Sequence, residues 1–398
     1  MLTLLLYLVG GILTISLGAA TFYYLFFSIV AYLLPNRRII PGELNPSTKF
    51  AIIIPAHDEE ETISPVLASL TELDYPEALY SLYVIADNCS DDTARLARLG
   101  GAEVLERTDD EHRGKGYALS WAIPRVLNAD VDAVLVLDAD CTPSVGALRV
   151  ADAAFHGGCH VLQLDNRAAN PDDSPASFAV AVGNAIENDL FYAPKARLGL
   201  NAFLRGTGMV IHRDVLERHP WNAHSVAEDV EYSVGLISGG EAIRFTNEAS
   251  VSSPFPVDLD QLRTQRERWA GGNIGLGKRM AFKLVFEGLK KRRPELLDAG
   301  ATMLLLSRPL ALLLALASIV TGWMAALSGG NWFLFDAACI FTLLLLFYLS
   351  LGLITVGLSP RRFHLLLGTP AVVLSLVGVA IKGLVKGAPE HWEKTPRR

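Results

Sequence analysis

Long apolar runs stand at both ends of the chain and leave a charged segment between them. The first run, Leu2 to Leu34, carries no charged residue. Three more runs follow near the C-terminus: Met303 to Leu327, Trp332 to Leu358, and Phe363 to Val385. Each is long enough for the ~20 residues with which a helix crosses the hydrocarbon core of a bilayer. The pattern predicts a membrane anchor over residues 1–36, membrane helices over residues 301–386 and a tail at 387–398.

The middle segment alternates short apolar runs with polar turns and helical patterns. Three strand-like runs end in polar residues: Phe50–Pro55, Leu82–Ala86 and Ala133–Leu137. Continuously apolar strands that alternate with helices are typical of an α/β fold with a parallel sheet. We therefore expect one α/β domain over residues 45–270, with its ligands at the carboxyl ends of the strands.

A basic amphipathic stretch joins this domain to the C-terminal apolar runs. Between Gly275 and Leu297, apolar residues such as Leu284 and Leu289 recur among many lysines and arginines. A solvated helix face would explain the cations but not their apolar partners. The pattern predicts a helix in the membrane interface over residues 271–300.

Composition supports a membrane protein with a globular middle domain. Hydrophobic residues make up 51% of the chain, and the mean hydropathy is +0.31, which is high for a soluble protein of this length. The net charge of −7 and the lack of a basic stripe with interleaved aromatic residues argue against a nucleic-acid partner. Four cysteines without paired spacing support neither a zinc site nor a disulfide framework, which suits a reducing, cytoplasmic face.

Basic residues near the apolar runs predict the orientation in the membrane. Arg37 and Arg38 follow the first run, seven cations lie between Lys278 and Arg293, and Arg361 and Arg362 separate the last two runs. The positive-inside rule places all of them in the cytoplasm. The first run exceeds the about 7 to 15 residues of a signal-peptide core, so we expect an uncleaved anchor in a multi-pass protein of the cell membrane.

The number of crossings conflicts with the charge of the tail. One crossing before a cytoplasmic domain and three after it would put the basic tail, residues 387–398, outside. Either one C-terminal run is re-entrant or interfacial, or the charge rule fails for the tail. Lys382 and Lys386 make the last run the suspect, because charged side chains are costly inside a bilayer.

Acidic residues follow two of the predicted strands. Asp138 and Asp140 are separated by one residue after the run that ends at Leu137, and Asp87 follows the run that ends at Ala86. Mg²⁺ takes one or two protein carboxylates and completes its shell with water and phosphate oxygens. A solvated acid pair is the simple alternative for Asp138 and Asp140, but their place at a strand end favours a metal and diphosphate site.

Several other residues at strand ends and in loops suit a nucleotide. We assign Pro55, His57 and Glu59 to this site with Asp87, and expect Lys115, on a glycine-bearing loop before a helical pattern, to meet phosphate. A surface loop is the alternative for Lys115. The sequence has neither a G-x-G-x-x-G after the first strand nor a P-loop motif, which argues against dinucleotide and P-loop sites.

Two acids at a predicted helix start suit general-base chemistry. Glu228 and Asp229 precede an apolar pattern through Val230 and Val234. Negative charge that complements a helix dipole is the alternative. A sugar transfer with inversion needs one carboxylate to take the proton of the acceptor hydroxyl. We assign this role to Asp229, with Glu228 in support.

A short Gln/Arg/Trp string and a glycine-bearing loop complete the candidate site. Gln265, Arg268 and Trp269 would share one face of a helix, where a guanidinium beside an indole can bind phosphate and a sugar face. An interfacial anchor is the alternative. Gly206 and Thr207 lie in a segment whose glycines permit close approach to a ligand, or form a tight turn.

Together these residues resemble the membrane-embedded inverting glycosyltransferases of family 2, which include cellulose, chitin, hyaluronan and poly-N-acetylglucosamine synthases. The resemblance implies a GT-A fold in which Asp87 contacts the nucleoside and Asp138 and Asp140 form a D-x-D site for Mg²⁺ or Mn²⁺. It also implies that Asp229 is the base and that Gln265, Arg268 and Trp269 are the family's Q-x-x-R-W. The chain departs from the usual pattern at Ala86, at Ala227 and over residues 204–207, which leaves the acceptor undetermined.

Three functions follow from this reading. The first is a polysaccharide synthase that uses a nucleotide-diphosphate sugar, by analogy a UDP-sugar, at the cytoplasmic face. The second is a lipid glycosyltransferase that adds one sugar to a ceramide-like, diacylglycerol or polyprenyl acceptor, favoured by the small number of membrane runs. The third is an inactive scaffold, which the intact acids argue against. The need for an accessory subunit is left open.

Overall fold

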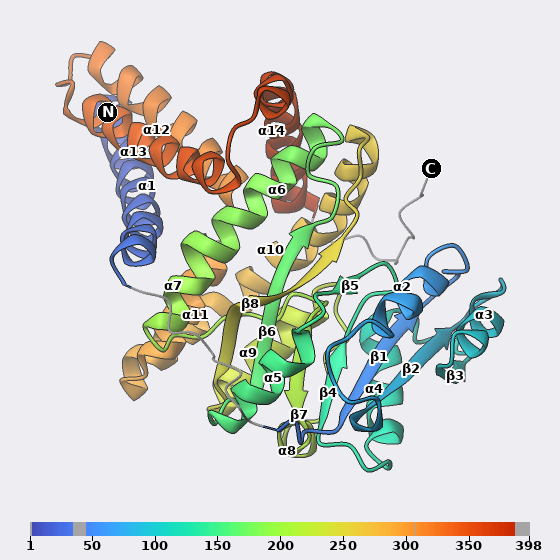
Figure 1. Cartoon of the computed structure of the whole chain (residues 1–398). Helices are drawn as coiled ribbons and strands as arrows, with labels where there is room; N and C mark the ends of the chain where they lie inside the picture. The colour runs from blue at the N-terminus through green and yellow to red at the C-terminus, as the bar shows by residue number, and fades with distance from the viewer. Residues whose placement is uncertain (1, 35–44, 306, 387–398) are drawn as a thin grey trace.

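The computed structural model describes residues 2–34, 45–305 and 307–386. A sheet domain has helices on both faces, and a group of long helices, α1 Leu2–Leu33, α12 Arg308–Leu327 and α13 Phe333–Val356, extends from it (Figure 1). We call this group the helical arm; the N-terminal end of the chain lies at its far end. Arg37, Arg38 and the tail at 387–398, on which part of the predicted orientation rests, lie outside the described residues.

The sheet of the described domain has eight strands in the order β3-β2-β1-β4-β7-β6-β8-β5. Strands β3, β2, β1 and β4 run parallel, β6 and β8 run parallel, and β7 is antiparallel to both of its neighbours. The expected α/β fold is confirmed, with a mixed sheet in place of a wholly parallel one. The strands are β1 Phe50–Ala56, β2 Tyr80–Asp87, β3 Glu103–Arg107, β4 Ala133–Val136, β5 Thr142–Pro143, β6 Val161–Ala168, β7 Met209–His212 and β8 Ile243–Ser253.

Both faces of the sheet are buried, which explains the continuously apolar strands. Successive side chains of a strand point to opposite faces, so Ile52 and Ile54 pack on one side and Ile53 on the other. On the first side lie α2 Ile63–Leu70, α3 Thr93–Leu99 and α5 Ala147–His156; on the second lie α4 Lys115–Val126, α8 Arg213–Arg218 and α9 Glu228–Gly239.

A long helical path leads from the sheet to the arm. After β6 come α6 Pro175–Glu187, the π-helical turn η2 Asn188–Tyr192 and α7 Ala193–Arg197; after β8 come α10 Leu259–Lys291 and α11 Pro294–Leu305. The short 3₁₀ turn η1 Glu77–Leu79 precedes β2. The Phe191 ring of η2 packs edge-on against Phe27 of the first helix, with centroids 5.3 Å apart, so the domain core continues into the arm. The expected domain boundary at residue 270 falls inside α10.

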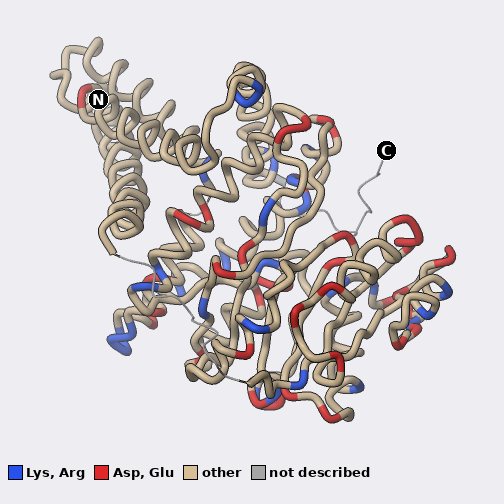
Figure 2. The backbone as a smooth tube through the Cα atoms, in the orientation of Figure 1, with Lys and Arg blue, Asp and Glu red and all other residues tan. Residues whose placement is uncertain are grey.

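Four helices in the described part of the chain are long and apolar enough to cross a membrane: α1 Leu2–Leu33, α12 Arg308–Leu327, α13 Phe333–Val356 and α14 Pro360–Lys386. Figure 2 shows that the arm formed by α1, α12 and α13 carries almost no charge, in contrast to the sheet domain. The expected run from Met303 is split, because α11 ends at Leu305 and α12 begins at Arg308 with Pro309 in its first turn.

The N-terminal end of α1 lies beside the turn between α12 and α13. The Thr3 hydroxyl donates to the Ser328 carbonyl at 3.0 Å, and the Tyr7 hydroxyl donates to the Asn331 carbonyl at 2.9 Å. Within the bundle, a Cβ on Gly18 would lie 2.8 Å from the Phe341 ring, so a glycine is needed for this close approach.

Helix α14 packs along the sheet domain at both of its ends. Near its start, Arg362 Nε donates to the Asp172 carboxylate at 2.7 Å. Near its end, Lys382 forms an ion pair with Glu267 of α10. Between them, Val372 joins a small apolar cluster with α6 and α10, and Figure 1 shows α14 beside these two helices.

Candidate active site

The predicted site residues gather at one edge of the sheet. Because β1, β2 and β4 are parallel, the residues after their carboxyl ends meet there. The reversed strand β7 begins at the same edge, where Gly208 N–H donates to the Val136 carbonyl at 2.9 Å. This pairing brings residues 206–208 next to the end of β4, although about 70 residues separate them in the sequence.

Lys115 joins three segments of the site. Its ammonium group donates to the Asp138 carboxylate and, at 2.6 Å, to the Gly206 carbonyl. The backbone N–H of Asp138 donates in turn to the Thr207 hydroxyl at 3.2 Å. Burial opposes the charge on Lys115, but the carboxylates of Asp138, Glu228 and Asp229 outweigh it and raise the pKa of the ammonium. Lys115 is therefore a fixed positive charge.

The Asp138 and Asp140 side chains suit a hard divalent cation. Their carboxylate oxygens and the Cys141 sulfur lie within 4.8 Å of one another. Burial raises the pKa of Cys141 well above its usual range, so this thiol stays protonated and donates to Asp140 at 3.4 Å. The two carboxylates thus remain the oxygen ligands that Mg²⁺ or Mn²⁺ takes.

The Asp87 carboxylate forms a buried ion pair with an arginine. Arg107, the last residue of β3, donates to the Asp87 carboxylate at 2.6 Å, and the two side chains are only 6% and 8% exposed. Arg107 also donates to Asp109 at 2.8 Å. Burial raises the pKa of Asp87 and the arginine partly offsets this shift. Arg107 therefore fixes the position of Asp87 at the strand end.

The other predicted nucleotide residues frame Asp87. Pro55 is half-buried near the end of β1, and His57 Nδ1 donates to the Asp87 carbonyl at 2.7 Å. The Glu59 N–H donates to the Thr93 hydroxyl at 2.7 Å, which ties the loop after β1 to the start of α3. Pro55, His57 and Asp87 thus lie together, and Glu59 begins the adjoining loop.

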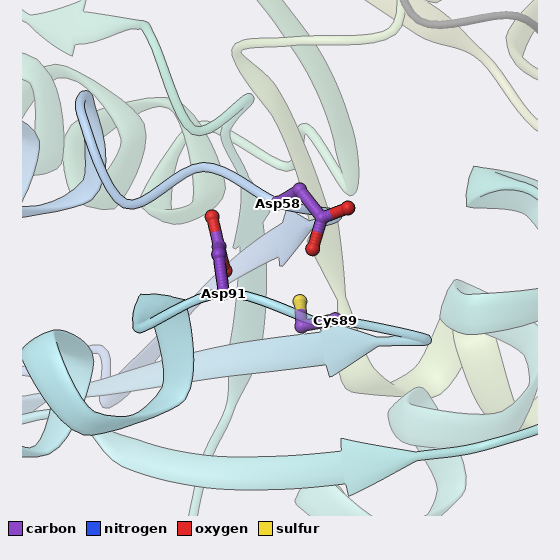
Figure 3. A group of neighbouring side chains, drawn as sticks. All are labelled: Asp58, Cys89 and Asp91. Atoms are coloured by element: carbon purple, nitrogen blue, oxygen red, sulfur yellow. The ribbon is translucent and has the colours of Figure 1, made fainter.

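Two acids and a cysteine lie close together in the loops that follow β1 and β2 (Figure 3). The ligand atoms of Asp58, Cys89 and Asp91 lie within 4.8 Å of one another. Asp58 accepts from the Ser90 N–H at 2.6 Å, and Asp91 accepts from the Thr93 N–H at 3.0 Å. Burial raises the pKa of Cys89 to about 11, so its thiol is neutral. Hydrogen bonds within and between these loops explain this group.

Glu228 and Asp229 begin α9 and face the same centre. A Cβ on Gly206 would lie 3.5 Å from Asp229 Oδ2 and 3.6 Å from Lys115 Nζ, and Gly206 has a φ of 79°. Burial and the charge of Asp229 raise the pKa of Glu228, and burial raises the pKa of Asp229 to about 6. The two carboxyl groups therefore titrate as an interacting pair, in which burial and mutual repulsion favour binding of a proton.

Helix α10 passes close to the start of α9, where Glu228 and Asp229 lie. A Cβ on Gly272 would lie 3.3 Å from the Ala227 Cβ, so small residues let α10 approach the start of α9. Burial lowers the pKa of Arg268, and the charges of Glu228 and Asp138 oppose that shift. Trp269 stacks under the Arg266 guanidinium, with Cζ 5.0 Å from the ring centroid. Gln265 Oε1 is buried and has no hydrogen-bond partner among the described residues.

A model of glycosyltransferase-like family 2 matches residues 46–272, more than half of the chain. The chain belongs to this family. It therefore carries a family 2 glycosyltransferase domain, and this mixed, Rossmann-like domain has the GT-A fold. The match ends inside α10, just after Trp269.

Two named relatives of this chain are synthases of different products. The chain is 26% identical over 279 residues to cellulose synthase 1 catalytic subunit of Komagataeibacter xylinus; the alignment covers 66% of this chain and 37% of that protein. It is 27% identical over 250 residues to β-monoglucosyldiacylglycerol synthase of Trichormus variabilis, covering 58% and 50%. The chain thus spans about half or less of these relatives.

One solved structure is similar over nearly the whole chain. A mannosyltransferase from Pyrobaculum calidifontis, in complex with GDP-mannose and Mn²⁺, superposes with a TM-score of 0.61 at 19% identity, and the alignment covers 96% of this chain and 99% of that one. The similarity extends the shared fold beyond the sheet domain to the helical arm.

Sequence reasoning missed five charged residues near the site. Arg107 supports Asp87, and a second group consists of Glu187, Arg205, Arg266 and Arg308. Only Arg308 could have been suspected of a functional role from the sequence, because it is a charged residue within an expected membrane run. The others come from separate elements, so their meeting depends on the tertiary fold.

Proposed function

We propose that this glycosyltransferase transfers a sugar, with inversion, from a nucleotide-diphosphate sugar to an acceptor anchored in the membrane. The observation that supports the proposal best is the convergence of Lys115, Asp138, Glu228 and Asp229, whose charges act on one another and, for Glu228 and Asp138, on Arg268. Fixed cations beside two metal-binding acids suit a diphosphate, and a buried carboxylate beside them suits the acceptor hydroxyl.

In this proposal the donor lies along the strand ends. Asp87, His57 and Pro55 contact the nucleoside, with Glu59 at the edge of that site, and Asp138 and Asp140 hold Mg²⁺ or Mn²⁺. Such a cation would neutralise the diphosphate charge when bound. Lys115 and Arg268 stabilise the negative charge that develops as the nucleoside diphosphate leaves. The mannosyltransferase of the same fold was also solved with Mn²⁺.

Asp229 acts as the general base. It takes the proton of the acceptor hydroxyl while the acceptor oxygen attacks the anomeric carbon, on the side opposite to the leaving diphosphate. A raised pKa suits this role because a base is most effective when its pKa lies near the working pH. The raised pKa of Glu228 limits the negative charge beside this base. Gly206 and Thr207, with Gln265 and Trp269, line the acceptor side.

The membrane arrangement that we propose has three crossing helices and one surface helix. Helices α1, α12 and α13 cross, which puts the N-terminus and the turn after α12 on the outer side together, as the Thr3 to Ser328 contact requires. Helix α14 lies on the cytoplasmic surface, since Arg362 and Lys382 near its two ends both pair with the sheet domain. The basic tail then stays inside, which removes the conflict in the number of crossings.

The acceptor that this arrangement favours is a lipid. Three crossing helices are few to enclose a polymer channel, and α12 begins directly beside the site at Arg308. A growing polysaccharide is the second candidate, supported by the cellulose synthase relative.

Membranes that contain the protein, incubated with radiolabelled UDP- and GDP-sugars and Mg²⁺ or Mn²⁺, test the proposal. We expect label in the solvent-extractable fraction, dependent on a divalent cation and lost in Asp229→Asn. Label in high-molecular-weight material would favour the polysaccharide. Transfer that survives in Asp229→Asn would refute the assigned base.

A further inference from the structure

A second charged cluster lies beside the acceptor side of the site. Arg205 Nη2 lies 3.3 Å from the Glu187 carboxylate, and Arg308 Nη1 lies 3.8 Å from the same oxygen. All three side chains are less than a fifth exposed. We count Arg266 of α10 as the fourth member, because its Nε is buried without a hydrogen-bond partner among the described residues and the charges of the other three act on its guanidinium. We call this group the arginine cluster.

The arginine cluster has an excess of positive charge. Three guanidinium groups face one carboxylate, so two positive charges lack a counterion within the group. Burial would raise the pKa of Glu187, but the three arginines outweigh it and keep this group ionised. Burial, with the neighbouring arginines, lowers the pKa of Arg266 to about 10, which still leaves it charged at neutral pH.

Two donor atoms of the arginine cluster are buried without a partner. The Nε atoms of Arg266 and Arg308 have no hydrogen-bond partner in the part of the chain that the structure describes. Buried charges and donors without partners are costly, and a bound anion with several oxygens would satisfy both. Guanidinium groups match phosphate oxygens in particular.

The arginine cluster differs from the expected donor site. In the donor site Lys115 contacts Asp138, whereas in the arginine cluster Arg205 and Arg308 contact Glu187. The charges that act on Arg268 and on Arg266, two residues apart on α10, divide in the same way. In the proposed function the donor diphosphate already has Lys115 and the cation that Asp138 and Asp140 would hold as partners, so the arginine cluster is available to a second anion.

The position of the arginine cluster indicates where that anion comes from. Arg205 directly precedes Gly206, which lies against Asp229, and Arg308 is the first residue of an apolar helix that can cross the membrane. The cluster therefore connects the base to the start of the membrane helices. A lipid acceptor whose reacting hydroxyl is at Asp229 would bring its headgroup through this place.

We propose that Arg205, Arg266 and Arg308 bind a phosphate group of the acceptor, so that the acceptor is a phosphate-bearing lipid rather than a neutral one. This inference rests on the proposed function, of which it specifies the acceptor class. Glu187 holds the guanidinium groups in place and limits their positive charge.

The test measures lipid binding without donor or turnover. Purified full-length protein in neutral detergent is titrated with farnesyl phosphate and with farnesol, which share one tail and differ in the phosphate group. We expect the wild-type protein to bind farnesyl phosphate at least about tenfold more tightly, as charge-assisted hydrogen bonds are worth this much or more. In Arg266→Gln/Arg308→Gln this preference should fall to about twofold or less.

Three controls separate phosphate binding from a structural role. Arg263→Gln, an exposed arginine on the same helix, should keep the preference. Glu187→Gln should keep or increase it, because the variant removes the competing carboxylate, whereas a purely structural ion network would lose it. Binding of UDP with Mn²⁺ should be unchanged in all variants, which excludes the donor phosphates as the source.

Equal binding of farnesyl phosphate and farnesol by the wild-type protein would overturn the inference. So would a preference that disappears in Glu187→Gln, or one that UDP with Mn²⁺ abolishes by competition. These failures are distinct from failure of the proposed function, because hydrolysis of nucleotide sugar by the same preparation would still show an active transferase.

Discussion

The acid limb of the pH–rate profile is the sharpest test of the assigned base. Only ionised Asp229 can accept the hydroxyl proton, so activity must fall as pH drops through its pKa. Burial raises this pKa to about 6, compared with about 3.9 for an ordinary aspartate. At pH 5 about a tenth of Asp229 would be ionised, so kcat/KM should be about tenfold below its plateau.

Three variants identify which group causes this limb. Lys115→Gln removes a positive charge that lowers the pKa of Asp229, so the limb should move to higher pH, together with a lower plateau. Glu228→Gln resembles the protonated Glu228 and should keep most of the activity, whereas Asp229→Asn should abolish it.

The assay is initial-rate transfer from labelled donor between pH 4.5 and 8, with saturating metal and a check of reversibility after return to pH 7. A flat kcat/KM down to pH 5 would refute a buried base with a raised pKa. A limb that stays in place in Lys115→Gln would mean that this lysine does not interact with the base.

Three further predictions concern the metal, the nucleoside site and the membrane arrangement. Asp140→Asn should weaken Mn²⁺-dependent UDP binding at least about tenfold in calorimetry; unchanged affinity would place the metal elsewhere. Arg107→Met should destabilise the protein by about 3 to 5 kcal/mol in denaturant unfolding, because it leaves a buried carboxylate unpaired. Arg95→Met, which breaks an exposed pair, should cost less than about 1 kcal/mol, and similar losses for both would contradict the buried ion pair. Single cysteines at Ser359 and Val385, in a background without other cysteines, should both react with an impermeant maleimide from the cytoplasmic side; labelling of one position from outside would show that α14 crosses the membrane.

The helical arm illustrates how much composition alone determines. Uncharged runs of sufficient length can only be buried in lipid or in a large core, so the four apolar helices were predicted with ends within a few residues of those observed, except at Met303. Their arrangement was not predictable. Whether α14 crosses depends on Arg362 and Lys382 meeting Asp172 and Glu267, and neither pairing has a sequence signal.

The sequence by itself determined the α/β class, the parallel strands β1, β2 and β4, and the grouping of Asp87, Asp138 and Asp140 at their ends. This follows because strand periodicity is local and parallel strands align their carboxyl ends. Only the tertiary structure decided that β7 reverses to bring Gly206 against Asp229, that Arg107 supports Asp87, and that Arg205 and Arg308 converge on Glu187. These contacts join residues far apart in the chain, and their stability comes from burial and charge pairing that no local pattern records.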